Sequence, residues 1–224
     1  RYGVEVGRDV TLDELRAQGF KAFYVAIGCQ GGRLAGIPGE DAEDVTVAVD
    51  FLREVNSGHV DALPGRTIVV GGGNVAIDVA RNACRLGSEH VEMFCLESEA
   101  EMPASEEERR EAIEDGAHIS CGWGPKEVHL DEAGRVCGIT FKRCTRVMDD
   151  EGRFAPEYDE NDLRRVDADR VVMSIGQSIV WGDLLAGSKV ELGRGQGALA
   201  DPQTYQTAEP DIFVGGDVYT GPSF

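Results

Sequence analysis

The chain has 224 residues, 42% of them hydrophobic and 28% charged, and its formal net charge is −19 at pH 7. These proportions are typical of a globular protein that is long enough for one large or two small domains, each with its own core. The negative charge argues against a nucleic-acid or anionic-membrane partner, because both would be repelled over the whole surface. No apolar run approaches the ~20 residues that span a bilayer and no signal sequence opens the chain, so we expect no membrane span and a cytoplasmic location.

The cysteines and histidines show the pattern of neither a disulfide framework nor a metal site. The six cysteines lie mostly in apolar periodic segments and include no C-x-x-C pair, which favours buried thiols in a reducing compartment over a disulfide or redox role. The same absence argues against a dithiol–disulfide reductase. The four histidines share no metal-ligand spacing, so we expect no metal ligands.

The first part of the chain predicts a helix, a strand and a second helix. Thr11 and Glu14 have the spacing of a capping box, which marks the start of a short helix. The segment 20–27 is rich in strand formers and ends at Gly28, so we expect a buried strand there. A loop with glycines and prolines follows, and residues 45–55 then carry apolar side chains at helical spacing.

The central stretch of the sequence, residues 66–86, predicts a strand, a tight turn and an amphipathic helix. Gly71, Gly73 and Ala76 match the pattern G-x-G-x-x-A. In that pattern the first glycine makes the turn, the second lets the backbone approach a pyrophosphate, and the small third residue lets the helix pack on the strand. The N–H groups at the start of the helix would then face two phosphates.

A second strand is expected at residues 90–96, which completes a strand–helix–strand unit of about 30 residues. This context favours nucleotide binding over a turn that only joins strand and helix. Asn74, at the start of the helix, is either an N-cap or a pyrophosphate contact. The residues that we expect at the nucleotide are Gly71, Gly72, Gly73, Asn74, Val75 and Ala76.

An acidic residue, Glu97, stands at the end of the second predicted strand. A carboxylate at this point accepts hydrogen bonds from the ribose hydroxyls of the adenosine half. It would also repel a 2′-phosphate, so it favours NAD(H) over NADP(H). The alternative is a solvated surface glutamate, because an acidic run with Glu99 and Glu101 follows directly.

Further elements are predicted beyond this point. Ser105 and Glu108 have capping-box spacing at the start of a charged helix, and residues 118–121 predict a third strand. The alternation of strands and helices favours a parallel sheet with right-handed crossovers, which is a Rossmann-like α/β fold.

From residue 126 onward the pattern changes to period-two alternation in 127–130, 136–147 and 166–175. We expect a small three-stranded antiparallel meander there, inserted before a last parallel strand at 170–175. The segment 187–200 is rich in glycine and predicts a loop.

Five ordered motifs resemble those of the small (β) subunit of glutamate synthase and related flavin-dependent pyridine-nucleotide oxidoreductases. They are Ala26-Ile27-Gly28 with residues 37–41, the glycine turn of residues 71–81, Met102-Pro103-Ala104, Ser174-Ile175-Gly176-Gln177, and residues 212–217 with Gly216-Asp217. In this family the members that use NADPH carry an arginine pair before the Met-Pro element. Leu96 and Glu97 occupy those positions here, which also supports NAD(H).

The resemblance implies a nucleotide domain flanked by partial pieces of a flavin domain. Residues 1–62 would be the C-terminal part of the first FAD-domain segment with a connecting helix, 63–180 the NAD(P)-binding domain, and 181–224 the start of the second FAD-domain segment. Further cofactor-binding residues would be Ala26, Ile27, Gly28, Gly216 and Asp217 toward FAD, and Ile175, Gly176 and Gln177 in the return strand.

The implied activity is the transfer of a hydride from NADH to FAD, and of electrons onward to iron–sulfur centres or a partner subunit. No side chain need act as acid or base, because the cofactors supply the reactivity. The family's own flavin G-x-G-x-x-G and its iron–sulfur cysteines are not in this sequence. We therefore expect this chain alone to bind NADH without retaining FAD or turning over. The alternative is a non-enzymatic NAD-binding or scaffolding module of a larger complex.

Overall fold

The computed structural model describes residues 1–221, and by its internal contacts the chain divides into two compact units. The units are Gly32–Gly176, and Arg1–Gly31 together with the segment that starts at Gln177. Two short strands, β2 (Gly31–Gly32) and β11 (Gln177–Ser178), pair with each other.

The larger unit is built on a parallel sheet of five strands in the order β3-β10-β4-β5-β6. Their bounds are β3 (Val45–Val47), β4 (Arg66–Val70), β5 (His90–Cys95), β6 (His118–Cys121) and β10 (Arg170–Met173). Each neighbouring pair is parallel, which confirms the predicted parallel sheet. The nearly continuous apolar sequences of β4 and β5 fit strands that are buried on both faces.

The segment 32–62, which the sequence analysis placed with the first flavin-domain piece, has its contacts in this larger unit. Residues 45–47, predicted as the start of a helix, form β3 and pair with β10, and the helix begins only at Ala48. The Val-Thr-Val sequence explains the difference, because β-branched residues lose rotamer freedom in a helix and pack well in a strand.

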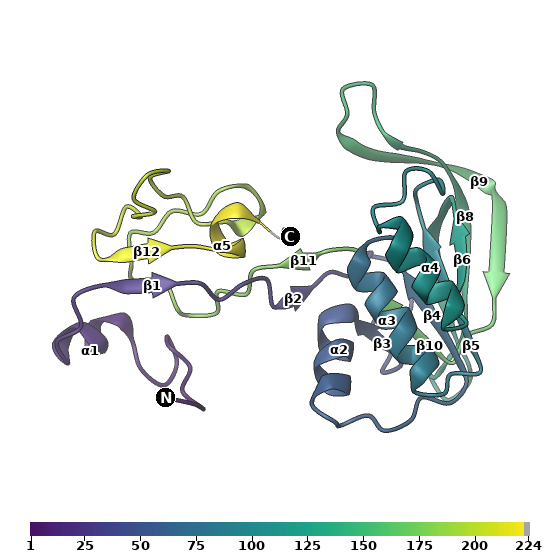
Figure 1. Cartoon of the computed structure of the whole chain (residues 1–224), viewed down its shortest axis with the longest axis horizontal. Helices are drawn as coiled ribbons and strands as arrows, with labels where there is room; N and C mark the ends of the chain where they lie inside the picture. Colours follow the sequence, from purple (N-terminus) through teal and green to yellow (C-terminus); the bar gives the residue numbers. More distant parts are fainter. Residues whose placement is uncertain (222–224) are drawn as a thin grey trace. The chain divides into compact units, whose positions relative to one another are not determined.

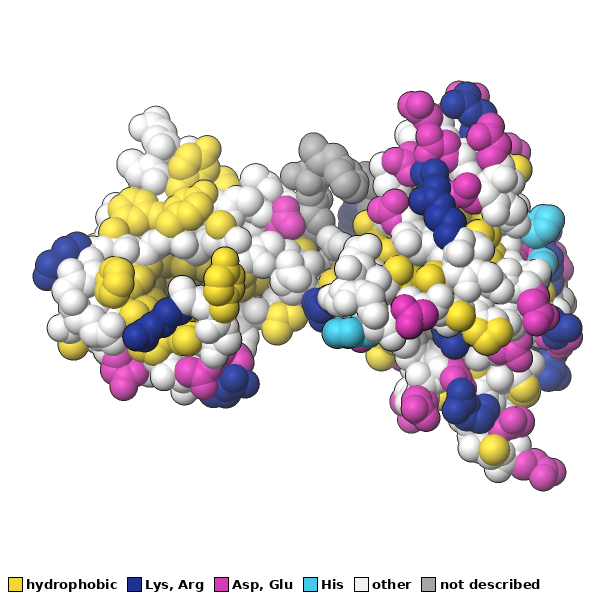
Figure 2. All heavy atoms as spheres, turned by 60° about the horizontal axis from the view of Figure 1, so that its bottom comes forward, with side chains coloured by type: hydrophobic (Ala, Val, Ile, Leu, Met, Phe, Trp, Pro, Cys, Tyr) yellow, Lys and Arg dark blue, Asp and Glu magenta, His cyan; other side chains and the backbone are white. Residues whose placement is uncertain are grey.

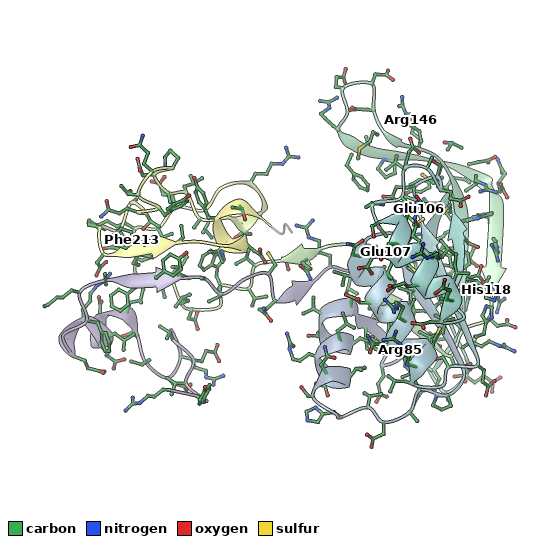
Figure 3. All side chains as sticks on the ribbon, in the orientation of Figure 1. Arg85, Glu106, Glu107, His118, Arg146 and Phe213 are labelled. Carbon is green, nitrogen blue, oxygen red and sulfur yellow. The ribbon has the colours of Figure 1, made fainter. Side chains whose placement is uncertain are left out.

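Three helices cover one face of the sheet (Figure 1). They are α2 (Ala48–Asn56), α3 (Asn74–Arg85) and α4 (Glu106–Glu114). Ala76, Val79 and Ala83 of α3 have no exposed surface, and two of the three are alanines, which let the helix lie close to the sheet. Ser105 caps α4, because its side chain accepts a hydrogen bond from the Glu108 N–H. The other half of the predicted capping box is not formed, since the Ser105 N–H donates to Asn74 Oδ1. Figure 3 shows the acidic first turn of this helix, which suits the positive end of the helix dipole.

An antiparallel meander follows β6 and covers the other face of the sheet. Its strands are β7 (Trp123–Leu130), β8 (Val136–Met148) and β9 (Phe154–Val166). Phe141 of β8 stacks on Phe94 of β5 with ring centroids 3.9 Å apart, and neither side chain has exposed surface. The predicted α/β fold with an inserted three-stranded meander is therefore confirmed.

The third strand of the meander lies elsewhere than the sequence pattern placed it. The predicted meander strand at 166–175 is wrong, because the third strand is β9, and Arg170–Met173 is the parallel strand β10 alone. No residue of β9 is fully buried: Pro156, Tyr158, Arg164 and Val166 are half-buried and the others are exposed. A strand without a buried face needs no apolar alternation, so the pattern that predicts strands is missing from it.

The smaller unit is organised around two short parallel strands. Its elements are α1 (Leu12–Ala17), β1 (Phe23–Val25), η1 (Arg194–Gln196), β12 (Ile212–Val214) and α5 (Asp217–Thr220). Val25 pairs with Val214 and both are buried. The predicted capping box of Thr11 and Glu14 is present, with hydrogen bonds in both directions.

The prediction of a buried strand over residues 20–27 is wrong in its extent and its burial. The strand has three residues, Tyr24 within it is 70% exposed, and only Val25 is buried. The reason is that β1 pairs only with β12 among the described residues, and a sheet of two short strands buries few of its side chains.

Charged side chains of both signs are mixed on the surface. Figure 2 shows Lys and Arg standing singly or in small groups among Asp and Glu. The visible face therefore offers no continuous basic area to a polyanion such as nucleic acid. Among residues 1–221, no helix combines the length and the apolar character that crossing a bilayer requires.

We predict that F141A destabilises the larger unit by about 3–5 kcal/mol, because it leaves a cavity between the sheet and the meander. Urea unfolding followed by circular dichroism measures this change. F154A is the matched control, since Phe154 lies in the same meander but is 65% exposed; its effect should stay within about 0.5 kcal/mol. Equal effects of the two substitutions would contradict the packing described here.

Candidate nucleotide-binding site

The glycine turn lies at the carboxyl edge of the parallel sheet, directly after β4. The N–H of Gly71 donates to the carbonyl of Phe94 at 2.8 Å, which joins the turn to β5. Gly71 has φ +140°, and a Cβ there would lie 2.2 Å from the carbonyl oxygen of Ser174. Only glycine fits, because any side chain would collide with backbone that cannot move aside.

Gly72 faces the residues that end β5. A Cβ at Gly72 would lie 2.8 Å from Cys95 Cβ and 3.1 Å from Glu97 Oε2. The Glu97 side chain, which is half-buried, therefore reaches back over the glycine turn. This is the side of the turn on which the ribose of a dinucleotide is expected, and the structure brings Glu97 and the turn together as a single site.

Gly73 has free space where a side chain would begin, whereas Gly71 and Gly72 do not. It is the N-cap of α3, no side chain caps the helix, and a Cβ at Gly73 would have no atom within 4 Å. The first N–H groups of α3 are thus presented without a side chain covering them. Such a helix start is suited to hold an anion such as a pyrophosphate.

The two predicted roles of Asn74 are separated by the structure. The N-cap role is wrong, since Gly73 is the N-cap and Asn74 is the first residue of α3. The Asn74 Oδ1 accepts a hydrogen bond from the Ser105 N–H at 3.2 Å, which ties the start of α3 to the start of α4. Contact of Asn74 or the half-buried Val75 with a pyrophosphate stays a prediction.

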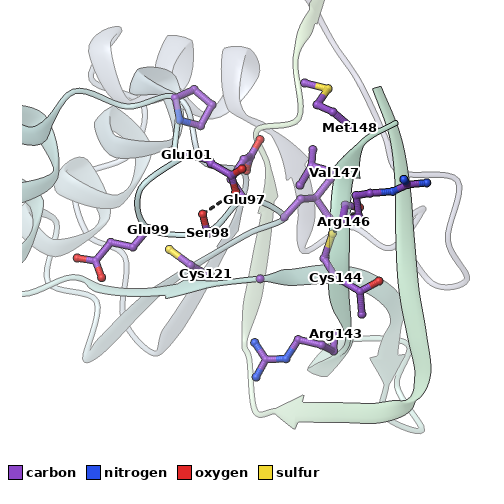
Figure 4. Close-up of a pocket in the computed structure, with 14 residues that line it drawn as sticks. Glu97, Ser98, Glu99, Glu101, Cys121, Arg143, Cys144, Arg146, Val147 and Met148 are labelled. Atoms are coloured by element: carbon purple, nitrogen blue, oxygen red, sulfur yellow. Dashed lines mark hydrogen bonds between the residues drawn. The ribbon is translucent and has the colours of Figure 1, made fainter. Parts of the chain in front are cut away.

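A cavity of about 710 Å³ opens beside Glu97, beyond the ends of β5 and β6 (Figure 4). Its lining residues are Leu96, Glu97, Ser98, Glu99, Glu101, Pro103, Cys121, Gly122, Arg143, Cys144, Thr145, Arg146, Val147 and Met148. The predicted Glu97 therefore lines a cavity together with the loop that follows β5. The residues contributed by β8 were missed, because no sequence pattern indicates that the meander returns to the edge of the sheet.

The cysteines were predicted to be buried thiols, and Cys29, Cys95 and Cys144 are buried whereas Cys84, Cys121 and Cys137 are half-buried. The Cys95 thiol lies 3.6 Å from the Cys121 sulfur on the neighbouring strand. Burial, helped by the neighbouring Cys121, raises the pKa of the Cys95 thiol. It is therefore protonated and unreactive at neutral pH.

The return strand reaches the other side of the glycine turn. The Ser174 N–H donates to the Val70 carbonyl at 2.7 Å, so Ile175 and Gly176 follow β10 at the same carboxyl edge as Gly71. The Ile175 side chain is 36% exposed. Gln177, predicted to act with them, has its contacts in the smaller unit.

The smaller unit brings together the ends of its two parallel strands. A Cβ at Gly28, which has φ +67°, would lie 3.7 Å from Asp217 Oδ2. Ala26 and Ile27 are exposed beside it, and a Cβ at Gly216 would have no atom within 4 Å. The residues predicted to contact a flavin thus share one edge of this unit, and their contact with FAD stays a prediction.

The sequence matches the family of pyridine nucleotide-disulphide oxidoreductases over residues 3–224, and the chain belongs to that family. It is 31% identical to the glutamate synthase (NADPH) small chain of Escherichia coli (strain K12), over 99% of this chain and 50% of that one. It is also 31% identical to the NAD-dependent dihydropyrimidine dehydrogenase subunit PreT of Escherichia coli O157:H7, over 97% of this chain and 46% of that one. The chain thus spans half or less of the length of these relatives.

The fold is shared with a solved structure. FprA of Mycobacterium tuberculosis, in complex with NADPH, matches 99% of this chain and 63% of its own with a TM-score of 0.76 and 20% sequence identity. The predicted resemblance to the glutamate synthase small subunit and related oxidoreductases is therefore confirmed. The names of the two relatives include both NADPH and NAD, so family membership leaves the choice of nucleotide open.

We predict opposite consequences for two glycines of the same turn. G71A should cost about 3 kcal/mol of unfolding free energy, because it combines a positive φ with a backbone collision. G73A should cost about 1 kcal/mol or less, since Gly73 has a negative φ of −88° and free space for a Cβ, so that only the N-cap preference for glycine over alanine is lost. Thermal and urea unfolding of both variants test this pair. A G73A variant as unstable as G71A would contradict the open position of Gly73.

Proposed function

We propose that this chain is the NAD(H)-binding portion of a flavin-dependent oxidoreductase, which passes a hydride from NADH to FAD and electrons on to iron–sulfur centres or a partner subunit. The observation that carries the proposal is the position of Glu97. Its Oε2 lies 3.1 Å from where a Cβ of Gly72 would be, in a cavity at the carboxyl edge of a parallel sheet. Ligands of such sheets bind outside the carboxyl ends of the strands.

The glycine turn and the start of α3 would hold the pyrophosphate. Gly71 makes the turn, and Gly73 leaves the helix start accessible. Backbone N–H groups of Asn74 and Val75 would donate to phosphate oxygens, with the helix dipole adding a favourable field. Ala76, which has no exposed surface, keeps the helix close to β4 so that these donors face the nucleotide.

Glu97 would select the nucleotide. Its carboxylate would accept hydrogen bonds from the two hydroxyls of the adenosine ribose, and such charge-assisted bonds contribute about 1.5–3 kcal/mol. A 2′-phosphate in the same place would bring like charges together. Leu96 and Glu97 stand where an arginine pair is expected in NADPH-using relatives, which supports a preference for NADH.

The smaller unit would contribute to the FAD site in the intact enzyme. The carboxylate of Asp217 lies beside Gly28, where it could accept hydrogen bonds from ribitol hydroxyls. Bound FAD supplies the hydride-accepting chemistry. The part of this chain is to bind and align the nucleotide, and to exclude water from it, without a side chain acting as acid or base.

Partners and location follow as part of the same proposal. A flavoprotein that accepts electrons from NADH needs an acceptor, and the iron–sulfur centres or a partner subunit would take that place. The remainder of the FAD domain is a further part of the assembly. A cytoplasmic location suits this use of NADH.

We predict that E97Q weakens NADH binding by about 1.5 kcal/mol, or roughly tenfold in Kd, because a neutral amide replaces a charge-assisted acceptor. NADPH binding should stay equal or improve, since the repulsion of the 2′-phosphate is removed. Isothermal titration calorimetry with both nucleotides measures the ratio. The control is E107Q, because Glu107 is an exposed residue of α4 (Figure 3) that does not line the cavity. A native chain that binds NADPH as tightly as NADH would refute the role given to Glu97.

We also predict that the purified chain binds NADH but does not retain FAD, because the glycine-rich flavin turn of the family is not in its sequence. Gel filtration after incubation with FAD, followed by the flavin absorbance band, tests this. A flavin band that elutes with the protein would be the opposite result. In the intact enzyme, NADH oxidation with an artificial electron acceptor separates an oxidoreductase from a scaffolding module, since only the former reduces the acceptor.

A further inference from the structure

Two cysteines that are 26 residues apart in the sequence lie opposite each other at the carboxyl end of the sheet. Cys95 is the last residue of β5 and Cys121 the last of β6, and the two are partners in the parallel ladder. Both are free thiols, and their sulfur atoms are 3.6 Å apart. The sequence analysis favoured thiols without a redox role, because the spacing of cysteines along the chain does not reveal the register of two strands.

The strand register gives this pair the spacing that a disulfide needs. Neighbouring strands lie about 4.7–4.9 Å apart, and the Cα atoms of disulfide-bonded cysteines are usually about 4.4–6.8 Å apart. Both side chains lie on the face of the sheet that the helices cover, so they point in the same direction. Since the sulfurs are already in contact, a small approach brings them to the S–S bond length of about 2.05 Å.

The two thiols differ in their access to solvent. Cys121 is half-buried and lines the cavity beside Glu97 (Figure 4), so a small oxidant can reach its sulfur. Cys95 is 2% exposed and does not line the cavity. An oxidant that enters the cavity therefore meets Cys121 first, and the thiol in contact with Cys121 is that of Cys95.

We propose that Cys121 and Cys95 are a redox-sensitive thiol pair, which hydrogen peroxide oxidises to a disulfide. The Cys121 sulfur attacks one peroxide oxygen, the O–O bond breaks, and the products are a sulfenic acid on Cys121 and water. The Cys95 sulfur then attacks the Cys121 sulfur. An S–S bond replaces the S–O bond, and the hydroxyl group leaves with the Cys95 proton as a second water. Two thiols thus lose two electrons, and one peroxide is reduced to two waters.

Contact compensates for the low intrinsic reactivity of Cys95 in the second step. Burial raises the pKa of the Cys95 thiol and keeps it protonated, which makes it a poor nucleophile toward reagents in solution. Strand pairing holds it against Cys121, and a reaction within a fixed pair needs no encounter. A reducing thiol can reach the Cys121 sulfur through the same cavity, so the disulfide is reversible.

The pair is connected to the candidate nucleotide site on two sides. A Cβ at Gly72 would lie 2.8 Å from Cys95 Cβ, so the glycine turn packs directly on Cys95. The Cys95 thiol donates to the Glu97 carbonyl at 3.7 Å, and the Gly122 N–H, next to Cys121, donates to the same carbonyl at 2.9 Å. An S–S bond removes the thiol donor and moves Cys95 beneath the turn. On the basis of the proposed function, oxidation therefore displaces Glu97 and weakens the binding of NADH.

Peptide mass spectrometry tests the disulfide itself. Trypsin places Cys95 in the peptide 86–109 and Cys121 in the peptide 111–126, because arginines and a lysine lie at their ends. The native chain is treated with hydrogen peroxide, and its remaining thiols are blocked with N-ethylmaleimide before unfolding and digestion. We expect the two peptides to be joined, with the loss of two hydrogen atoms, and dithiothreitol to separate them.

Three other cysteine positions serve as controls for this assignment. C95S should leave a sulfenic acid on Cys121, which dimedone labels. C144S removes the other thiol that lines the cavity and should form the disulfide as the native chain does. Cys137, which is half-buried in the meander and does not line the cavity, should remain a thiol.

Isothermal titration calorimetry tests the effect on the nucleotide site. We expect the Kd for NADH to be about tenfold higher for the oxidised chain, because the carboxylate of Glu97 leaves its position, and to return to its first value after dithiothreitol. C121S can form neither the sulfenic acid nor the disulfide, so peroxide should leave its Kd unchanged. It also controls for oxidation of Met148, which lines the same cavity and which dithiothreitol does not restore.

The outcomes separate this inference from the proposed function. A disulfide between Cys121 and Cys144, or a Cys121 that stays unlinked in the peroxide-treated native chain, would overturn the thiol pair. An unchanged Kd after complete formation of the disulfide would overturn its effect on Glu97. If neither NADH nor NADPH binds the reduced chain, the proposed function fails, whereas the mass spectrometry still decides whether the disulfide forms.

Discussion

The close backbone contact at Gly71 is the constraint on which the site depends. The turn after β4 donates a hydrogen bond to β5 through the Gly71 N–H, and its Cα faces the carbonyl of Ser174 so closely that no Cβ fits. The ends of β10, β4 and β5 are thereby held side by side. Glu97, the start of α3 and the return strand follow these three ends, so their positions relative to one another follow from one glycine.

The sheet is buried on both faces, and the elements that cover these faces also lie near its carboxyl edge. The helices bury residues such as Val69 and Met93 on one face, and the meander buries Ile68 and Phe94 on the other. The meander starts directly after β6, through Gly122, and its long strand β8 runs back toward the edge of the sheet. An element that completes the core is in this way also a neighbour of the candidate site.

The sequence predicted well those parts whose signals are local. The turn, α3 and the strand before Glu97 each have a pattern within a few residues, because glycine requirement, helical amphipathicity and strand burial act locally. Strand β9 was missed because none of its side chains is fully buried. The residues that β8 contributes to the cavity were missed because the loop after β5, which they face, lies some fifty residues earlier in the chain. Such contacts come from tertiary packing, which no local pattern encodes.

Nucleotide choice in this site would depend on two segments acting together. Glu97 would oppose a 2′-phosphate directly, but Glu99 and Glu101 line the same cavity, and both arginines of β8 already have carboxylate partners. Replacing Glu97 alone removes one of three negative charges and supplies no free cation. A full change of preference to NADPH would require a guanidinium without a carboxylate partner near the ribose, which is what an arginine at position 96 or 97 would provide. In the proposed site, the acidic loop after β5 and the paired arginines of the meander would therefore act in the same direction, toward a nucleotide without a 2′-phosphate.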